Sequence, residues 1–132
     1  MMMKVCIKAI LHRDGKLLIL QRSNQDDIGP GDWELPGGTI EWNERAEDAV
    51  HRELMEEIGV RVTAFRLAYI SSFFLNNTTK VFVINYLVEA EGEIRLSREH
   101  QRFLWSSDDE ARELLVPGVY HDYHQYVVKE QL

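Results

Sequence analysis

The chain has 132 residues, of which 45% are hydrophobic and 28% are charged. This composition is that of a globular protein and excludes a disordered tail or a fibrous repeat, and we expect a single domain over residues 1–132. One cysteine, Cys6, excludes an intrachain disulfide. No apolar run approaches the roughly 18 residues of a membrane helix, and the N-terminus lacks the layout of a signal peptide. We therefore expect a cytoplasmic protein without a membrane partner.

The charge is negative and unevenly distributed. Fifteen Lys and Arg residues against 22 Asp and Glu residues give a net charge of −7, which argues against a nucleic-acid partner. Seven acids and two bases lie between Glu41 and Glu57, so five of the excess negative charges fall there. Met1–Arg22 holds five bases and one acid, a local charge of +4. An acidic focus beside a basic segment is typical of a metal-plus-anion site, and equally of a solvated helix face.

The first third of the chain predicts short strands and one long loop. Val5–Leu11 alternates apolar with polar residues, Leu17–Gln21 is apolar, and an Asp-Gly pair lies between them, which indicates a β-hairpin. Ser23–Asp32 is a long polar loop, and loops of this length are often functional. Trp33–Leu35 is a short strand that ends at the loop Pro36–Gly38.

A helix is predicted next, over Glu44–Ile58, with Asn43 as its N-cap and Gly59 as its left-handed C-terminal residue. The remaining elements mix strands and helices, and Pro117-Gly118 separates the last two. They are strands at Arg61–Ile70, Lys80–Glu89, Ile94–Leu96 and Arg102–Trp105, a short helix that Ser107 opens with a capping-box pattern and that ends at Leu115, and a final helix at Val119–Glu130. This order predicts an α/β (α+β) protein with a mixed sheet covered by helices.

The helix over Glu44–Ile58 places acids where apolar residues belong. At about 100° per residue, Glu53 and Glu57 lie at the edge of the apolar stripe or inside it, and Glu56 lies outside. Partly buried carboxylates about 6 Å apart repel each other by roughly 3 kcal/mol per pair at a dielectric near 20. The pattern therefore predicts a bound cation. Oxygen ligands without His or Cys favour Mg²⁺, with Mn²⁺ also possible, over zinc.

The same residues carry a resemblance to a known family. Gly38 is followed after five positions by Glu44 and after seven more by Arg52-Glu53-Leu54-Met55-Glu56-Glu57-Ile58-Gly59-Val60. This stretch resembles the signature box of the Nudix hydrolases, and all nine specified positions match. The resemblance implies a Nudix-type α/β/α sandwich and metal-dependent hydrolysis of a nucleoside diphosphate linked to another group.

The resemblance also implies roles for individual residues. Glu53, Glu56 and Glu57 would be the metal-binding carboxylates, with the carbonyl of Gly38 as a further ligand, while Arg52 and Glu44 would brace the helix and orient Glu53. The family is not uniform about the catalytic base, which is either Glu53 or an acid from a later loop. Our candidate for that later acid is Glu99, with Glu93 as a weaker competitor and an ordinary exposed glutamate as the alternative.

The substrate is less well encoded than the metal site. The simple layout is similar to members that act on (deoxy)nucleoside triphosphates and release a monophosphate and pyrophosphate. Arg22 and Gly37 are candidate substrate-binding residues. For Arg22, an ordinary surface arginine without a role in binding is an equally good interpretation. Four aromatic residues are candidates to stack on a nucleobase, with packing in the core as the alternative: Phe73, Phe74, Tyr86 and Trp105.

Three alternatives remain open. They are a hydrolase of a nucleotide conjugate (nucleotide sugar, ADP-ribose or dinucleoside polyphosphate), a non-catalytic nucleotide-binding module, and a prenyl diphosphate isomerase. The isomerase would require a catalytic cysteine, and Cys6 is the only candidate. In each of the first two cases the partner is a nucleotide, and the protein is expected to be a monomer or a homodimer.

Overall fold

The computed structural model describes residues 1–131, so Leu132, the last residue of the predicted domain, lies outside the described part. The strands are β1 (Met2–Arg13), β2 (Lys16–Arg22), β3 (Trp33–Glu34), β4 (Gly37–Thr39), β5 (Arg61–Asn76), β6 (Thr79–Glu91) and β7 (His100–Ser106). The helices are α1 (Ala46–Ile58), α2 (Asp108–Leu114) and α3 (Pro117–Tyr123), and α3 continues into a π-helical turn at His124–Val128 and a 3₁₀ turn at Lys129–Gln131. Over residues 1–131, no helix is long and apolar enough to span a bilayer.

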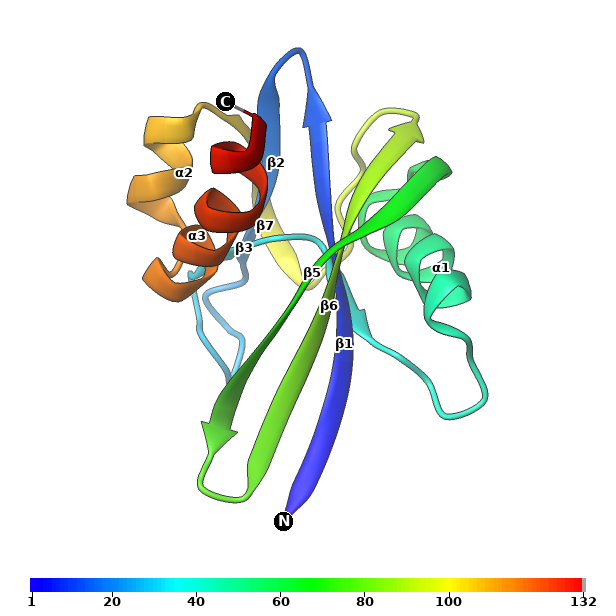
Figure 1. Ribbon diagram of the computed structural model, residues 1–132, viewed down its shortest axis with the longest axis vertical. Coiled ribbons are helices and arrows are strands. Elements are labelled where there is room, and N and C mark those ends of the chain that lie inside the picture. The colour runs from blue at the N-terminus through cyan, green and yellow to red at the C-terminus, as the bar shows by residue number, and fades with distance from the viewer. Residues whose placement is uncertain (132) are drawn as a thin grey trace.

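The seven strands form one mixed sheet between two layers of helix. Its main order is β3-β2-β1-β6-β5, with β4 added to β1 and β7 added to β2. The β1–β6 pair is parallel and the other pairs are antiparallel. Figure 1 shows α1 on one side of the strands and α2 and α3 on the other. The predicted sandwich with a mixed sheet is therefore confirmed.

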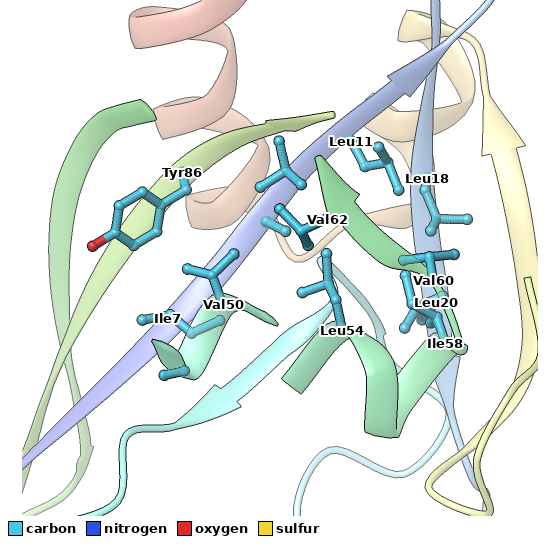
Figure 2. Close-up of a cluster of buried hydrophobic side chains, with 13 residues drawn as sticks. Ile7, Leu11, Leu18, Leu20, Val50, Leu54, Ile58, Val60, Val62 and Tyr86 are labelled. Carbon is cyan, nitrogen blue, oxygen red and sulfur yellow. The ribbon is translucent and has the colours of Figure 1, made fainter. Parts of the chain in front are cut away.

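Alternation along the central strands divides the core into two parts. Ile7, Ala9 and Leu11 of β1 pack on the side of α1, whereas Ile10 belongs to the cluster that holds Ala111 of α2. This is the period of two that places neighbouring side chains on opposite faces of a sheet. Figure 2 shows the part under α1, where the side chains of Val50, Leu54 and Ile58 face those of β1 and β2. The core therefore fixes the rotation of α1 on the sheet, and with it the direction of its glutamates.

The start of α1 differs from the prediction. Arg45, not Asn43, is the N-cap residue, and it makes no side-chain cap. Glu44 is outside the helix because its carboxylate accepts the backbone N–H of Glu41 and is held by Arg52, so the preceding residues form a turn. At the other end, Gly59 has the predicted left-handed conformation, with φ of 70°.

Two further segments were wrongly predicted from their local sequence. Gly37 and Gly38, predicted as part of the loop Pro36–Gly38, belong to strand β4, which pairs with β1. The predicted strand Ile94–Leu96 is irregular, because the N–H groups of Arg95 and Ser97 donate to the carbonyls of Ile58 and Glu57. These carbonyls belong to the last turn of α1, where a helix has no partners of its own.

The other differences are shifts of element ends. The hairpin of β5 and β6 extends further than predicted on both sides, as far as Asn76 and Thr79, and projects with β1 beyond the helices in Figure 1. The capping box predicted at Ser107 is confirmed. Pro117 does not interrupt the chain before the last helix but begins it, which is a favoured place for proline.

Comparing substitutions at Gly15 and Gly37 tests how closely the backbone of β4 approaches that of β1. Both have positive φ, but a Cβ on Gly37 would lie 2.1 Å from the backbone oxygen of Ile7, whereas nothing lies within 4 Å of a Cβ on Gly15. Gly15→Ala should lower the free energy of unfolding by about 1 kcal/mol, and Gly37→Ala by about 1–3 kcal/mol more. Equal losses in urea unfolding of the two variants would contradict the close approach.

Candidate active site

The three glutamates at the C-terminal end of α1, Glu53, Glu56 and Glu57, differ in exposure in the order that the helical spacing predicts. Glu57 is 5% exposed and belongs to the buried face of the helix. The side chain of Glu53 is 14% exposed and that of Glu56 is 62% exposed. The acidic stretch is therefore not a solvated face, because two of its carboxylates lie in or at the edge of the interior.

Two glycines of β4 bring the main chain against these carboxylates. The N–H of Gly37 donates to Oε1 of Glu57 over 2.8 Å. A Cβ on Gly38 would lie 2.6 Å from the carboxylate atoms of Glu53, so any larger residue would displace that side chain. Carboxylate oxygens beside a closely approaching main chain are the donor set that a hard divalent cation prefers. The residues present therefore fit a metal of this class.

Arg52 connects the acids to one another. It binds Glu44 with two hydrogen bonds, from Nε over 2.6 Å and from Nη2 over 2.8 Å. Its Nη1 donates to Glu53 over 3.0 Å and to Glu56 over 3.2 Å, and its Nη2 donates to the Thr39 carbonyl. The hydrogen bonds from Arg52 lower the pKa of Glu44 to about 2. The contacts are those expected of a brace that fixes the direction of Glu53.

A second group of charged residues lies next to the glutamates and was not predicted as part of the site. Lys8 donates from Nζ to Glu34 and to the Leu35 carbonyl, each over 3.0 Å, and Nε2 of His100 is 3.0 Å from Glu34. Burial alone would raise the pKa of Glu34, but Lys8, His100 and Arg22 lower it. One available signal was Lys8 as the sole charged residue of the predicted strand Val5–Leu11, and another was His100 directly after Glu99.

Arg22, predicted to contact phosphate, is held by neighbouring acids. Its Nη2 is 2.7 Å from Asp26 and its Nη1 is 3.0 Å from Glu34, while Nε donates to the Ile28 carbonyl. Arg22 also lines a cavity, so one side of this cluster borders space that a ligand can enter.

The loop before β7 places Glu99 beside the glutamates of α1. Oxygens of Glu57 and Glu99 and a ring nitrogen of His100 all lie within 4.8 Å of one another. Burial raises the pKa of Glu53 against the effect of Arg52, and the charges of Glu56 and Glu99 add to the rise. The competing acid Glu93 is not part of this group, so the geometry favours Glu99 over Glu93.

A cavity of about 450 Å³ adjoins the charged group. Lys8, Arg22 and Glu34 line it on the charged side. The rest of its lining is mostly apolar and includes Trp33, Tyr69, Leu75 and Phe73, with Asn85 and Asp122 among its polar residues. Of the predicted aromatic candidates Phe73 lines the cavity, whereas Tyr86 belongs to the buried core under α1. The size and the apolar lining are those of a small-molecule site.

The metal-free protein should lose stability as Glu57 ionises. Burial raises the pKa of Glu57 from 4.5 to about 7. Since the folded state favours the protonated form, this contribution is fully present below pH 4.5 and is lost as the pH rises through 7. The loss approaches about 3 kcal/mol.

The measurement is urea unfolding across this pH range with a chelator present. In Glu57→Gln the free energy of unfolding should no longer fall as the pH rises, whereas in Glu47→Gln, on the exposed side of α1, it should still fall. A difference between wild type and Glu57→Gln that is the same at pH 5 and pH 8 would contradict the burial of an ionisable carboxyl.

Comparison with known proteins supports one family for this chain. A protein named CTP pyrophosphohydrolase from Escherichia coli (strain K12) is 34% identical over 107 residues, which are 80% of this chain and 76% of the relative. Nucleoside triphosphatase NudI from Escherichia fergusonii is 28% identical over 116 residues, 80% of this chain and 82% of that protein. The similarity extends over most of each sequence.

Solved structures agree. The MutT protein from Methanosarcina mazei Go1 matches with a TM-score of 0.87 and 26% identity, over 98% of this chain and 95% of that one. The MutT NUDIX hydrolase from Burkholderia pseudomallei matches with a TM-score of 0.83 and 27% identity, over 95% of this chain and 98% of that one. The family model described as NUDIX domain matches residues 2–126. The chain therefore belongs to the Nudix family of hydrolases, enzymes that act on pyrophosphate bonds.

Proposed function

We propose that residues 1–132 act as one domain that hydrolyses a (deoxy)nucleoside triphosphate to a monophosphate and pyrophosphate. The observation that carries the proposal is a cavity of about 450 Å³ lined by Glu34, which is hydrogen-bonded to His100 of the cluster that also holds Glu57 and Glu99. The names of two relatives, a CTP pyrophosphohydrolase and a nucleoside triphosphatase, favour a triphosphate over a nucleotide conjugate.

The metal of the proposed enzyme is Mg²⁺ or Mn²⁺. Its ligands would be the carboxylates of Glu53, Glu56 and Glu57 and the carbonyl of Gly38. When bound, divalent cations neutralise the phosphates and acidify the attacking water. The exposed position of Glu56 gives it access to the solvent side of the cluster, while Glu57 is fixed from the interior by the Gly37 N–H.

The general base is Glu53 or Glu99. Glu53 is held in place by Arg52 and lies against Gly38, so its direction is fixed before the substrate arrives. Glu99 is exposed and lies on a loop, which leaves its carboxylate free to adjust. In either case the carboxylate takes a proton from the water that attacks phosphorus, and the phosphoanhydride bond to the leaving group breaks.

The remaining contacts would position the substrate. Arg22 is the proposed phosphate contact. Gly37, the other candidate, has its missing side-chain space filled by the backbone of Ile7 and does not line the cavity, so its part in the site is the N–H that holds Glu57. The nucleobase would enter the apolar part of the cavity near Phe73. Cys6 does not line this cavity, so the prenyl diphosphate isomerase has no nucleophile there.

Neutralising a ligand should abolish turnover and leave the fold intact. Glu56→Gln and Glu57→Gln should each lower kcat with Mg²⁺ at least about a hundredfold, the scale of losing a main electrostatic contact. Glu47→Gln is the matched control, because it makes the same change of charge on the exposed part of α1. Wild-type turnover in both ligand variants would refute the assignment.

A panel of substrates decides between the candidate reactions. Nucleoside triphosphates, nucleotide sugars, ADP-ribose and dinucleoside polyphosphates are incubated with the protein and Mg²⁺ or Mn²⁺, and all products are identified. We expect the highest kcat/KM for a triphosphate, with a monophosphate and pyrophosphate as products. Faster cleavage of a conjugate would favour the alternative hydrolase, and tight binding without products would favour the non-catalytic module.

Metal binding should also stabilise the fold. Since a ligand that binds only the folded state adds RT ln(1 + [L]/Kd), metal at about a hundredfold excess over Kd adds about 2.7 kcal/mol. Scanning calorimetry should show a higher Tm with Mg²⁺ or Mn²⁺ than with a chelator, and Glu57→Gln should show a smaller rise. No rise with either ion would count against a metal site in the cluster.

A further inference from the structure

His100 has one ring nitrogen that no other group satisfies. Its side chain is 2% exposed at the start of β7. Nε2 is hydrogen-bonded to Glu34 over 3.0 Å. Nδ1 has no hydrogen-bond partner, and among the described residues it is the one buried side-chain nitrogen or oxygen in this position. A buried polar atom without a partner costs free energy, so a native structure with such an atom calls for a reason.

The environment of Glu34 fixes which nitrogen carries the proton. Lys8 and Arg22 both donate to the Glu34 carboxylate, at 3.0 Å each, so that carboxylate is ionised and accepts only. The Nε2 of His100 must therefore be the donor in this bond. In a neutral imidazole the other nitrogen, Nδ1, then carries a lone pair. Nδ1 of His100 is thus a buried lone-pair donor to which no group of the described residues is bonded.

This histidine is next to the acids of the active site. A ring nitrogen of His100 and oxygens of Glu57 and Glu99 lie within 4.8 Å of one another. Two ligands of one cation at about 2.0–2.2 Å are separated by at most about 4.4 Å, so a small contraction brings all three onto one ion. A ligating histidine usually donates its other N–H to a carboxylate, and Glu34 accepts that bond here.

We propose that Nδ1 of His100, together with Glu57 and Glu99, forms a mixed nitrogen–oxygen metal site in this chain. The proposal deepens the proposed function, on which it rests. It adds Glu99 and His100 to the ligand set that contains Glu57, and it leaves Glu53 as the general base, because Glu99 is then a ligand. Imidazole nitrogen suits first-row transition ions, whereas Mg²⁺ prefers oxygen. The site should therefore prefer Mn²⁺ or Co²⁺ to Mg²⁺. The all-oxygen site expected from the helix alone changes because the fold adds a histidine from β7.

The charges of the surroundings agree with a divalent ion. Two carboxylates and a neutral imidazole supply two negative charges, and the nearby positive charge of Lys8 acts on Glu57 while Lys8 also pairs with Glu34. The Gly37 N–H donates to Oε1 of Glu57, which holds that oxygen in place. An apolar replacement for His100 would leave Glu34 with one partner fewer, so the best variant keeps a donor at that position.

The test is pulsed EPR of the protein with bound Mn²⁺ and no nucleotide. An imidazole ligand gives a ¹⁴N modulation, which should change to a ¹⁵N pattern when the protein is made with ¹⁵N-labelled histidine. His100→Gln keeps an N–H donor for Glu34 but removes the ligand, so its modulation should disappear. His51→Gln, on the same helix as the glutamates but exposed, should keep it. If His100→Gln does not fold, ¹⁵N labelling with single variants of the other four histidines still identifies the ligand.

A second measurement tests the choice of ion. The concentrations of Mn²⁺, Co²⁺ and Mg²⁺ that give half of the maximal Tm shift should favour the transition ions at least about tenfold, and His100→Gln should remove most of that preference. Absence of any histidine modulation in the wild type overturns the inference, whether Nδ1 then accepts from water or from substrate. Because cleavage of triphosphates is measured separately with Mg²⁺, that result leaves the proposed function standing, whereas loss of cleavage with every ion refutes the function itself.

Discussion

The carboxylate of Glu57 lies in the interior, where the Gly37 N–H and the charge of Lys8 compensate only part of the cost of ionisation. Its neighbours Glu34 and Glu99 add like charge instead of removing it. A helix that packs Leu54 and Ile58 into the core cannot turn to release Glu57, because every rotation that exposes the acid also exposes those apolar side chains. The arrangement is thus imposed by the packing of α1, and a cation is the counter-charge that suits it.

The acidic cluster and the cavity are linked through Glu34 and His100. Lys8 and Glu34 line the cavity, and Glu34 also holds His100, which lies beside Glu57 and Glu99. Lys8 comes from β1 and Glu34 from β3, so the sheet itself joins the two regions. This layout places the cavity and the acidic cluster on one rigid support, which positions a bound molecule better than two loops would.

Gly37 of β4 combines a positive φ with a close approach to β1, whereas at Gly38 only the close approach of the Glu53 side chain disfavours a larger residue. At Gly38 any Cβ would occupy the space of the Glu53 carboxylate, and at Gly37 it would collide with the carbonyl of Ile7. The same short strand therefore closes onto β1 on one side and meets the glutamates on the other. Arg52 completes the arrangement from solvent by holding Glu44 and Glu53 at once. Backbone approach and a charged brace together fix the direction of Glu53 before any ligand binds.

The sequence alone determined the family, the mixed sheet with its helices, and the exposure of the α1 acids, because the helical period and the spacing from Gly38 to Val60 are local properties. It failed at the start of α1, at β4 and at Ile94–Leu96, where pairing with distant segments satisfies the backbone. The positions of Lys8, Glu34 and His100 were decided only by tertiary structure. They come from three strands far apart in the chain, and no local pattern records which side chains a sheet brings together.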